Sequence, residues 1–411
     1  SSCQPSSSRG GCGAAQDAGV SLDSDIRDAI LRPEAALSRV ANHLIREFMI
    51  RLAELEPKLY REIRRRFGWI AERGILNASD FTTARLKKNL EELRRVLRAD
   101  YGAAGRELQT NLRTLLQAEA EFSTSVLVRY GSGKILGLDP ELVTEILTRR
   151  PFQGGVLRSW IRRLSIDTAW RVEKAILDGL NLGQGVDAIV RTLRGTRAGR
   201  YLDGILETSR RDAATIVRSA VAHVANTARD EIWSANADLL DDVRWLGTLD
   251  SRTCRVCAIR DGLLYTVTTH EPIGHSIDWE AGPGRMHPND RCTSVPELKG
   301  EKLTGQRAAK GGPVKASMTY LQWLKTQPAG VQDQVLGVTR ARLLRAGKLG
   351  LADMWDDHGR RLTLDELKEL EVFDTPLVGS LAWAKEQYEN GTVPEGWFVH
   401  GRARSQSLGT G

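Results

Sequence analysis

The stretch DVRWLGTLDSRTCRVC, residues 242–257, interrupts a chain whose other parts are mostly long runs with helical periodicity. Val243 and Trp245 alternate with polar residues, as on a strand with one buried face. Two cysteines, Cys254 and Cys257, follow directly. Further along, DGLLYTV (261–267) is typical of a turn and a second strand, and HPNDRCTSVPEL (287–298) adds a histidine, another cysteine and a third strand-like run. The sequence therefore predicts a small sheet that carries reactive side chains on its loops, over residues 241–298.

Four residues in these two stretches are of the types that bind zinc. Cys254 and Cys257 form a C-x-x-C pair, and His287 and Cys292 form a second pair. A tight turn between strands can point two thiolates at one ion, and the second pair then completes a tetrahedron. Four protein ligands leave no open coordination position, which is typical of structural zinc. Because so small a sheet has little core, metal binding would also supply folding free energy.

Other interpretations of the same residues stay open at this point. A C-x-x-C pair also occurs in redox proteins, although the expected βαβ context is missing. A cysteine nucleophile with His287 as its base is a second alternative. A nuclease with His287 as base and Asn289 or Asp290 on a catalytic metal is a third. The plainest alternative is a group of reduced cysteines in an apolar core.

Charged residues flank both stretches. Arg252 and Arg291 are expected to donate to backbone carbonyls or to Asp250 and Asp261, and so to fix the loops around the metal. This orienting role is favoured over catalysis, and we predict no catalytic residue. The loop between the two pairs also contains histidines, which we interpret as surface residues rather than spare ligands: His270 and His275.

The remainder of the chain has a helical pattern. Apolar residues recur at three- and four-residue steps over 24–67 and again over 86–115, which predicts a hairpin of two long amphipathic helices. The first helix is expected to break or bend at Pro33 and Pro57, and Ser79 is a candidate N-cap for the second. Further helices are predicted over 157–180 and 209–235. Thr363 and Glu366 have the spacing of a capping box.

These patterns predict an α+β fold that is predominantly α. We expect a long N-terminal helical hairpin or bundle, a small zinc-stapled unit that contains strands, and a C-terminal helical module. The predicted boundaries are a flexible leader (1–23), a helical hairpin domain (24–130), a second helical domain (131–240), the small α/β unit (241–298), a linker (299–315), the C-terminal module (316–372) and an irregular tail (373–411).

Composition narrows the class of protein. The 411 residues are 41% hydrophobic and 27% charged, which excludes wholesale disorder. No apolar run approaches the ~18 residues needed to cross a bilayer, and the N-terminus lacks a segment of signal-peptide type, so we expect a cytosolic protein. A net charge of +7, spread along the chain, permits contact with nucleic acid without requiring it. Five cysteines are few for a secreted disulfide scaffold.

The quoted stretches also resemble a known family. WLGTLDSRTC-x-x-C-x-x-x-DG (245–262) followed by HPN-x-RCT (287–293) is similar to the core signature of the phage head morphogenesis proteins, the Mu F-like minor head proteins. The preceding RSAVAHVANTARDEIW (218–233) and the later TYLQWLKTQPAGVQDQVLGVTRARLLRAGKL (319–349) resemble flanking parts of that family. The resemblance spans roughly residues 205–372. The family usually has a cysteine where this chain has Asp290, which makes Asp290 an alternative ligand.

The resemblance implies a minor structural protein of the virion head, needed in few copies for assembly, DNA packaging or ejection, and not an enzyme. The implied partners are the portal protein, the major capsid protein or both, and contact with packaged DNA and self-association are also considered. The implied location is the head interior or portal vertex of the virion, after assembly in the host cytoplasm. Two alternatives stay open: a metal-dependent nuclease that uses His287 and Asp290, and a host-directed effector carried in the virion.

Overall fold

The computed structural model describes residues 22–71, 84–130, 134–299, 306–350, 352–356 and 360–369. The predicted fold class is confirmed, because helices predominate and a small antiparallel sheet accompanies them. The predicted tail and the N-cap Ser79 lie outside the described residues, as does the predicted leader up to residue 21. Among the described helices, none has both the length and the apolar character that a membrane crossing requires.

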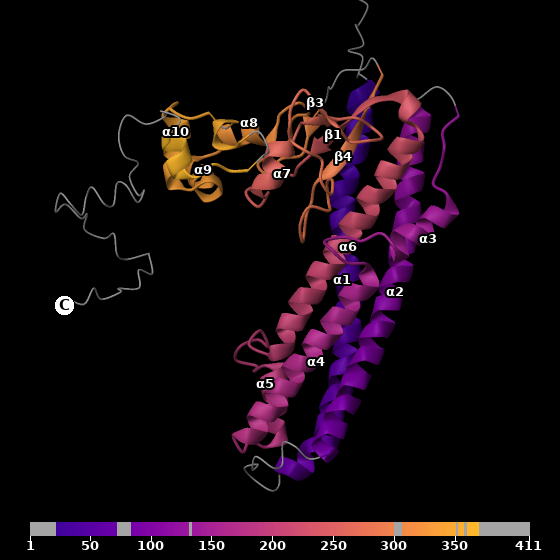
Figure 1. The fold of residues 1–411 in the computed structure, drawn as a ribbon, viewed down its shortest axis with the longest axis vertical. Coiled ribbons are helices and arrows are strands. Elements are labelled where there is room, and N and C mark those ends of the chain that lie inside the picture. The colour runs from indigo at the N-terminus through magenta and orange to yellow at the C-terminus, as the bar shows by residue number, and fades with distance from the viewer. Residues whose placement is uncertain are drawn as a thin grey trace, which may run out of the picture.

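Four long helices form an elongated stalk (Figure 1). They are α1 (Leu22–Ala71), α2 (Ala84–Tyr130), α4 (Leu157–Asn181) and α6 (Ile205–Ala235). Helices α2, α4 and α6 contact one another, and α1 contacts α2 and α6. Two shorter helices complete this part: α3 (Pro140–Thr148) and α5 (Val186–Arg194). Residues from the predicted domains 24–130 and 131–240 share one apolar core, which extends from Ala41 to Ala228. The boundary between these two domains stays a prediction.

The predicted break in the first helix is wrong, since α1 continues through both Pro33 and Pro57. A proline inside a helix removes one backbone hydrogen bond and costs about 3 kcal/mol or more. Leu55 and Leu59, on either side of Pro57, are both buried in the core of the stalk. The free energy gained by packing the whole apolar stripe exceeds the cost of the lost hydrogen bond, so the helix continues through the proline.

The sheet lies at the end of the stalk where α2 and α6 finish (Figure 1). Its strands pair antiparallel in the order β3-β2-β1-β4, with bounds β1 (Leu240–Leu246), β2 (Leu264–Tyr265), β3 (Pro272–Ile273) and β4 (Thr293–Leu298). The three expected strands are present, and β3 is a fourth within the expected loop. Because β4 is an edge strand, it accommodates Pro296 opposite Val243.

The sheet has a core of its own that includes the tips of two stalk helices. Trp245, Tyr265 and Trp279 pack with ring centroids 4.9–6.4 Å apart, and Leu127 of α2 and Trp233 of α6 belong to the same cluster. Aromatic rings in such tilted and edge-on arrangements stabilise a small core efficiently. The sheet is therefore anchored on the stalk by apolar contacts.

A C-terminal module projects to the side of the sheet (Figure 1). It contains α8 (Tyr320–Lys325), α9 (Ala329–Leu336), α10 (Val338–Arg345) and α11 (Leu364–Glu369), packed around a separate apolar core. The predicted capping box at the start of α11 is confirmed: Glu366 accepts a hydrogen bond from the Thr363 backbone, and the Glu366 backbone donates to the Thr363 hydroxyl. Within the predicted linker, residues 306–315 form a two-stranded hairpin of β5 (Gln306–Arg307) and β6 (Val314–Lys315).

Candidate metal centre

Cys254 and Cys257 lie at the start of a short helix, α7 (Arg255–Arg260), which follows β1 and its loop. The expected turn between two strands is therefore wrong. Cys254 is the N-cap residue, and its sulfur accepts a hydrogen bond from the backbone N–H of Cys257 at 3.4 Å. The first turn of a helix has unpaired N–H groups, and thiolate sulfur is a suitable acceptor for them. Helix geometry thus places both sulfurs on the same side.

The second pair lies on the loop between β3 and β4. His287 begins a tight turn in which the Asp290 backbone N–H donates to the His287 carbonyl at 3.1 Å. Asn289, inside this turn, has a φ of +60°, a left-handed conformation that asparagine adopts more readily than most residues. The turn brings His287 and Cys292 back toward α7.

The four predicted ligands come together in two overlapping trios. The ligand atoms of Cys254, Cys257 and His287 lie within 4.8 Å of one another, and so do those of Cys257, Asp290 and Cys292. Cys257 is common to both trios: its sulfur lies 3.4 Å from Nε2 of His287 and 3.6 Å from Oδ1 of Asp290. The arrangement is compact enough to hold one metal ion, with three sulfurs and one nitrogen as the soft or borderline ligands that zinc prefers.

The two ring nitrogens of His287 have different roles. Nδ1 lies 2.9 Å from the Pro288 carbonyl oxygen, to which it donates. This bond leaves Nε2, the nitrogen that faces Cys257, as the lone-pair donor of the neutral ring. A hydrogen bond from one nitrogen to a carbonyl is the usual way in which proteins orient a metal-binding histidine.

The thiols have unequal pKa values in the metal-free protein. Hydrogen bonds from Cys257 and from His287 lower the pKa of Cys254 to about 4, despite burial. The hydrogen bond with Cys254 raises the pKa of His287 to about 9. The pKa of Cys257 is raised by its hydrogen bonds to Cys254 and Cys292 and by burial. These contacts favour the charged form of Cys254 and disfavour that of Cys257, and a metal bound here would displace any remaining thiol proton.

Asp290 holds the loop in addition to facing the sulfurs. Its Oδ1 accepts from the Cys292 backbone N–H at 3.0 Å, and its Oδ2 accepts from the Met286 backbone N–H at 3.2 Å. The side chain is buried. Both carboxylate oxygens therefore fix the backbone on either side of His287, which accounts for a buried acidic residue at this position without requiring it to bind a metal.

Helix α6 holds the same loop from the other side. Arg218 donates to the Asn289 side chain at 2.7 Å, and the Asn289 backbone N–H donates to the Ser219 hydroxyl at 3.1 Å. Asn226 donates to the Cys292 carbonyl at 3.3 Å. The sequence analysis did not identify these residues. The available signal was the presence of the polar side chains Ser219 and Asn226 among the alanines and valines of this helix.

A second group of polar contacts joins α6 to strand β4. Buried Arg229 donates to Glu119 of α2 at 2.6 Å and also to the Thr293 hydroxyl. Its neighbour Asp230 accepts from Arg285 and, at 3.1 Å, from the Ser294 hydroxyl. A buried guanidinium requires such partners, because desolvation of an unpaired charge is costly. The strand is therefore fixed in register by side chains of the stalk.

Asp250 accepts hydrogen bonds from both arginines named in the sequence analysis. Arg291 donates to both oxygens of Asp250, at 2.6 and 2.8 Å, and the Arg252 backbone N–H donates at 2.9 Å. The Arg252 side chain is 79% exposed, so its contribution is mainly through the backbone. Burial raises the pKa of Asp250, but the hydrogen bonds and charge of Arg291 outweigh it and lower that pKa to about 2.

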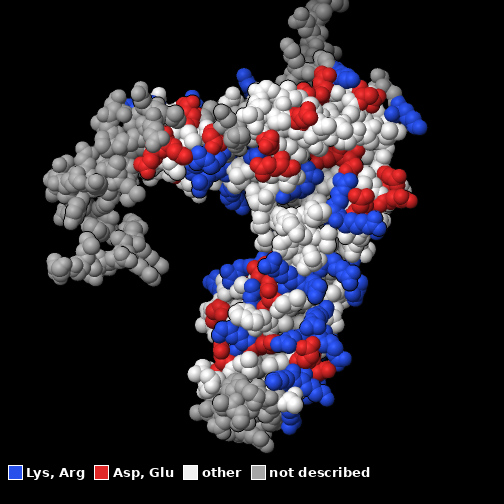
Figure 2. All heavy atoms as spheres, viewed as in Figure 1, with Lys and Arg blue, Asp and Glu red and all other residues white. Residues whose placement is uncertain are grey.

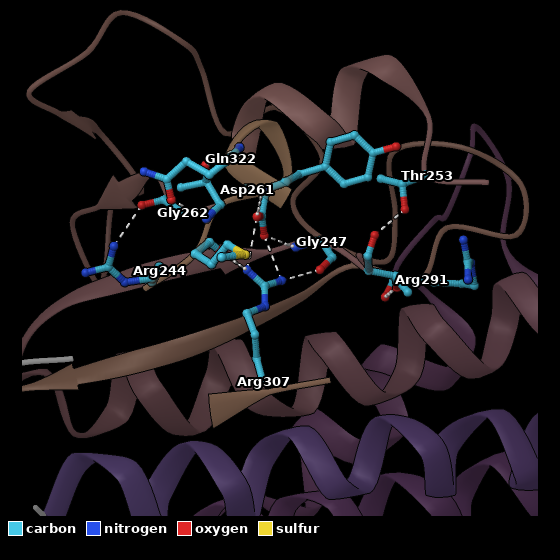
Figure 3. Close-up of polar contacts among 12 residues, drawn as sticks. Arg244, Gly247, Thr253, Asp261, Gly262, Arg291, Arg307 and Gln322 are labelled. Carbon is cyan, nitrogen blue, oxygen red and sulfur yellow. Dashed lines mark hydrogen bonds and ion pairs between the residues drawn. The ribbon is translucent and has the colours of Figure 1, made fainter. Parts of the chain in front are cut away.

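Asp261 has a partner that the sequence analysis missed. Its carboxylate accepts from two nitrogens of Arg307, at 2.9 and 3.0 Å, and from the backbone N–H groups of Gly247 and Tyr320 (Figure 3). The expected partners, Arg252 and Arg291, contact Asp250 instead. Arg307 comes from the predicted linker and is buried. The pair ties the end of β1, the turn before β2, the β5–β6 hairpin and the start of α8 together.

The two remaining histidines of this region lie outside both trios. The ring of His270 stacks on Trp279 with centroids 4.4 Å apart. His275 lies with Nε2 at 2.9 Å from the Leu264 carbonyl, to which it donates. Both are partly buried packing residues rather than free surface histidines.

Comparison with known proteins identifies the segment that contains this centre. Residues 170–295 match the family described as phage Mu protein F like protein, so this segment is a Mu F-like domain. No curated protein matches the chain significantly. No solved structure matches it significantly. The matched segment extends from the middle of α4 to β4 and contains all four predicted ligands, whereas the C-terminal module lies beyond it.

The Asp261–Arg307 pair generates a stability prediction. Asp261→Asn removes the charge that compensates a buried guanidinium, and we expect the free energy of unfolding to fall by about 3–5 kcal/mol. The matched control is Asp333→Asn, since Asp333 pairs with Arg345 at 2.9 Å where both side chains are 32% exposed. That variant should lose at most about 1 kcal/mol. Urea unfolding followed by tryptophan fluorescence measures both, and equal losses would contradict the role assigned to Asp261.

Proposed function

Because residues 170–295 form a Mu F-like domain, a family of structural phage head morphogenesis proteins that are generally not enzymes, we propose that this chain is a minor structural protein of a bacteriophage head. In this proposal it occupies the virion in few copies, next to the portal, and acts in head assembly, DNA packaging or ejection. The family match across the cysteine-bearing loops is the observation that carries the proposal.

The elongated stalk suits a protein that docks on other subunits. Four long helices present a large lateral surface, which includes exposed apolar side chains at Ile166, Trp170 and Leu182. Ile166 and Trp170 lie four residues apart on α4, and contiguous exposed apolar side chains are typical of surfaces that other proteins cover. We propose the portal protein or the major capsid protein as the partner of the stalk, with self-association as the alternative.

The metal in the proposed role is zinc, bound by Cys254, Cys257, His287 and Cys292. Four protein ligands would complete its tetrahedron and leave no position for a substrate, so its contribution is structural. The sheet supports this role, because two of its four strands contain only two residues each. We assign Asp290 to the backbone of the loop, since both of its oxygens accept backbone N–H groups.

The geometry gives little support to the nuclease alternative. His287 donates through Nδ1 to a backbone carbonyl and directs Nε2 at a cysteine, Asn289 accepts from Arg218, and Asp290 holds the loop. A catalytic metal needs ligands on an open cavity with room for water and substrate. None of these three side chains is free for that task in the described structure.

Contact with packaged DNA is part of the proposal. Lys and Arg side chains form bands across the stalk, interrupted by acidic residues, whereas much of the surface near the sheet is uncharged (Figure 2). With a net charge of +7, such a surface would meet phosphates without reading sequence. Contact of this kind weakens as salt rises, because it releases counterions.

The zinc assignment makes a prediction for purified protein. The wild-type chain should contain about one zinc, and Cys257→Ser should lose it together with the fluorescence signature of the packed tryptophans. Asp290→Asn should keep the zinc with reduced stability. His270→Ala is the matched control, since His270 lies in the same region but outside the trios. Elemental analysis measures the metal, and retention of zinc by Cys257→Ser would contradict the assignment.

The location makes a second prediction. Mass spectrometry of purified virions should detect the chain in far fewer copies than the major capsid protein. Lysine cross-linking should join it to the portal through the exposed Lys87 or Lys88 of α2. Comparing the amount of the chain in full virions with that in virions emptied of DNA shows whether the chain leaves with the genome. Absence of the chain from virions would contradict the proposed function.

A further inference from the structure

A cavity of about 190 Å³ lies between the metal-centre region and the C-terminal module. Its wall includes Thr253 and Arg255 from the start of α7, Tyr320 of α8, and Trp355 and Arg361 from the segment before α11. The volume exceeds that of a single water molecule several-fold, since one water occupies about 30 Å³ in the liquid. A small polyatomic ligand therefore fits.

Two arginines line this cavity and a third lies near them, and none of the three has a described acidic partner. Arg255 and Arg361 line it, and Arg340 lies close enough to both for their charges to interact. Neighbouring arginines of the same module do have partners: Arg345 pairs with Asp333, and Arg360 pairs with Asp356 and Glu366. Among the described residues, the cluster formed by Arg255, Arg340 and Arg361 thus carries uncompensated positive charge.

The cluster also contains donors that have no acceptor. Nε of Arg340, Nε of Arg361 and Nε1 of Trp355 are buried and lack a hydrogen-bond partner in the described structure. Arg361 donates to the Leu336 carbonyl and Arg340 donates to the Leu362 carbonyl, which holds these two side chains in place. Buried donors without acceptors cost free energy, so a ligand that accepts several hydrogen bonds would be favoured here.

Charge repulsion is consistent with the same conclusion. Burial, then the charge of Arg340 and that of Arg255, lower the pKa of Arg361 to about 10. An anion in the cavity would remove this repulsion. Guanidinium groups and an indole that line one cavity from different elements match a tetrahedral oxyanion, whose oxygens accept from several directions, better than they match a planar carboxylate.

We propose that this cavity is a binding site for a phosphate group. Arg255 and Arg361 supply the charge, Trp355 supplies a neutral donor, and Arg340 reinforces the positive potential. The site adjoins the metal centre through Cys254, which also lines the cavity, but it uses none of the proposed metal ligands as donors. The inference therefore does not depend on zinc or on a location in the virion.

Calorimetric titration of the full chain with inorganic phosphate, at fixed ionic strength, tests the proposal. Wild type should bind phosphate saturably at one site. Arg361→Gln should raise the Kd by about tenfold or more, and Arg255→Gln, an exposed position where folding is not at risk, by about threefold to tenfold. Arg345→Gln is the control with the same change in net charge, and it should bind as wild type does.

A second arm identifies the source of the phosphate. If the group belongs to a nucleic-acid strand, inorganic phosphate should displace a short single-stranded oligonucleotide, and both cavity variants should weaken its binding. If the group is free phosphate, the oligonucleotide should not compete for the site. Zinc content measured on the same samples separates this test from the zinc assignment. Absence of saturable phosphate binding, or equal binding by wild type, Arg255→Gln and Arg361→Gln, would overturn the proposal.

Discussion

The hydrogen bonds from helix α6 to the loop before β4 are the constraint on which the rest of the domain depends. Arg218, Ser219 and Asn226 bind the turn that contains His287, and Arg229 and Asp230 bind the strand that follows. Hydrogen bonds that place a loop this firmly also place its ligand atoms, since metal affinity depends on orientation as much as on ligand type. The stalk is thus a scaffold for the candidate metal centre.

The centre has a polar connection on each side. Toward the stalk, the Arg229–Glu119 pair joins α6 to α2 beneath the sheet. Toward the C-terminal module, the Asp261–Arg307 pair joins β1 to the hairpin and to α8. Buried ion pairs of this kind add little net stability against an apolar alternative, but they penalise any arrangement that separates the partners. They therefore specify how the three cores fit together.

The sequence predicted the parts of this structure that follow from local periodicity. Helical stripes located the long helices, alternation around Val243 located β1, and the spacing of Thr363 and Glu366 located a cap. It could not predict that α1 passes Pro57, because tertiary packing outweighs the local preference there. Nor could it pair Asp261 with Arg307, since a buried arginine in a basic, Gly-containing segment has the same local pattern as an exposed one. Contacts between residues that lie far apart in the sequence can be identified only once the fold is known.

The central claim is a structural zinc held by three sulfurs and one nitrogen. X-ray absorption at the zinc edge of the metal-loaded protein is the most direct test of it. The account predicts three Zn–S distances of about 2.3 Å and one Zn–N distance of about 2.0–2.1 Å, with no water in the coordination sphere. A sphere with two sulfurs and one or more oxygens would contradict it. That result would make Asp290 a ligand or leave an open coordination position.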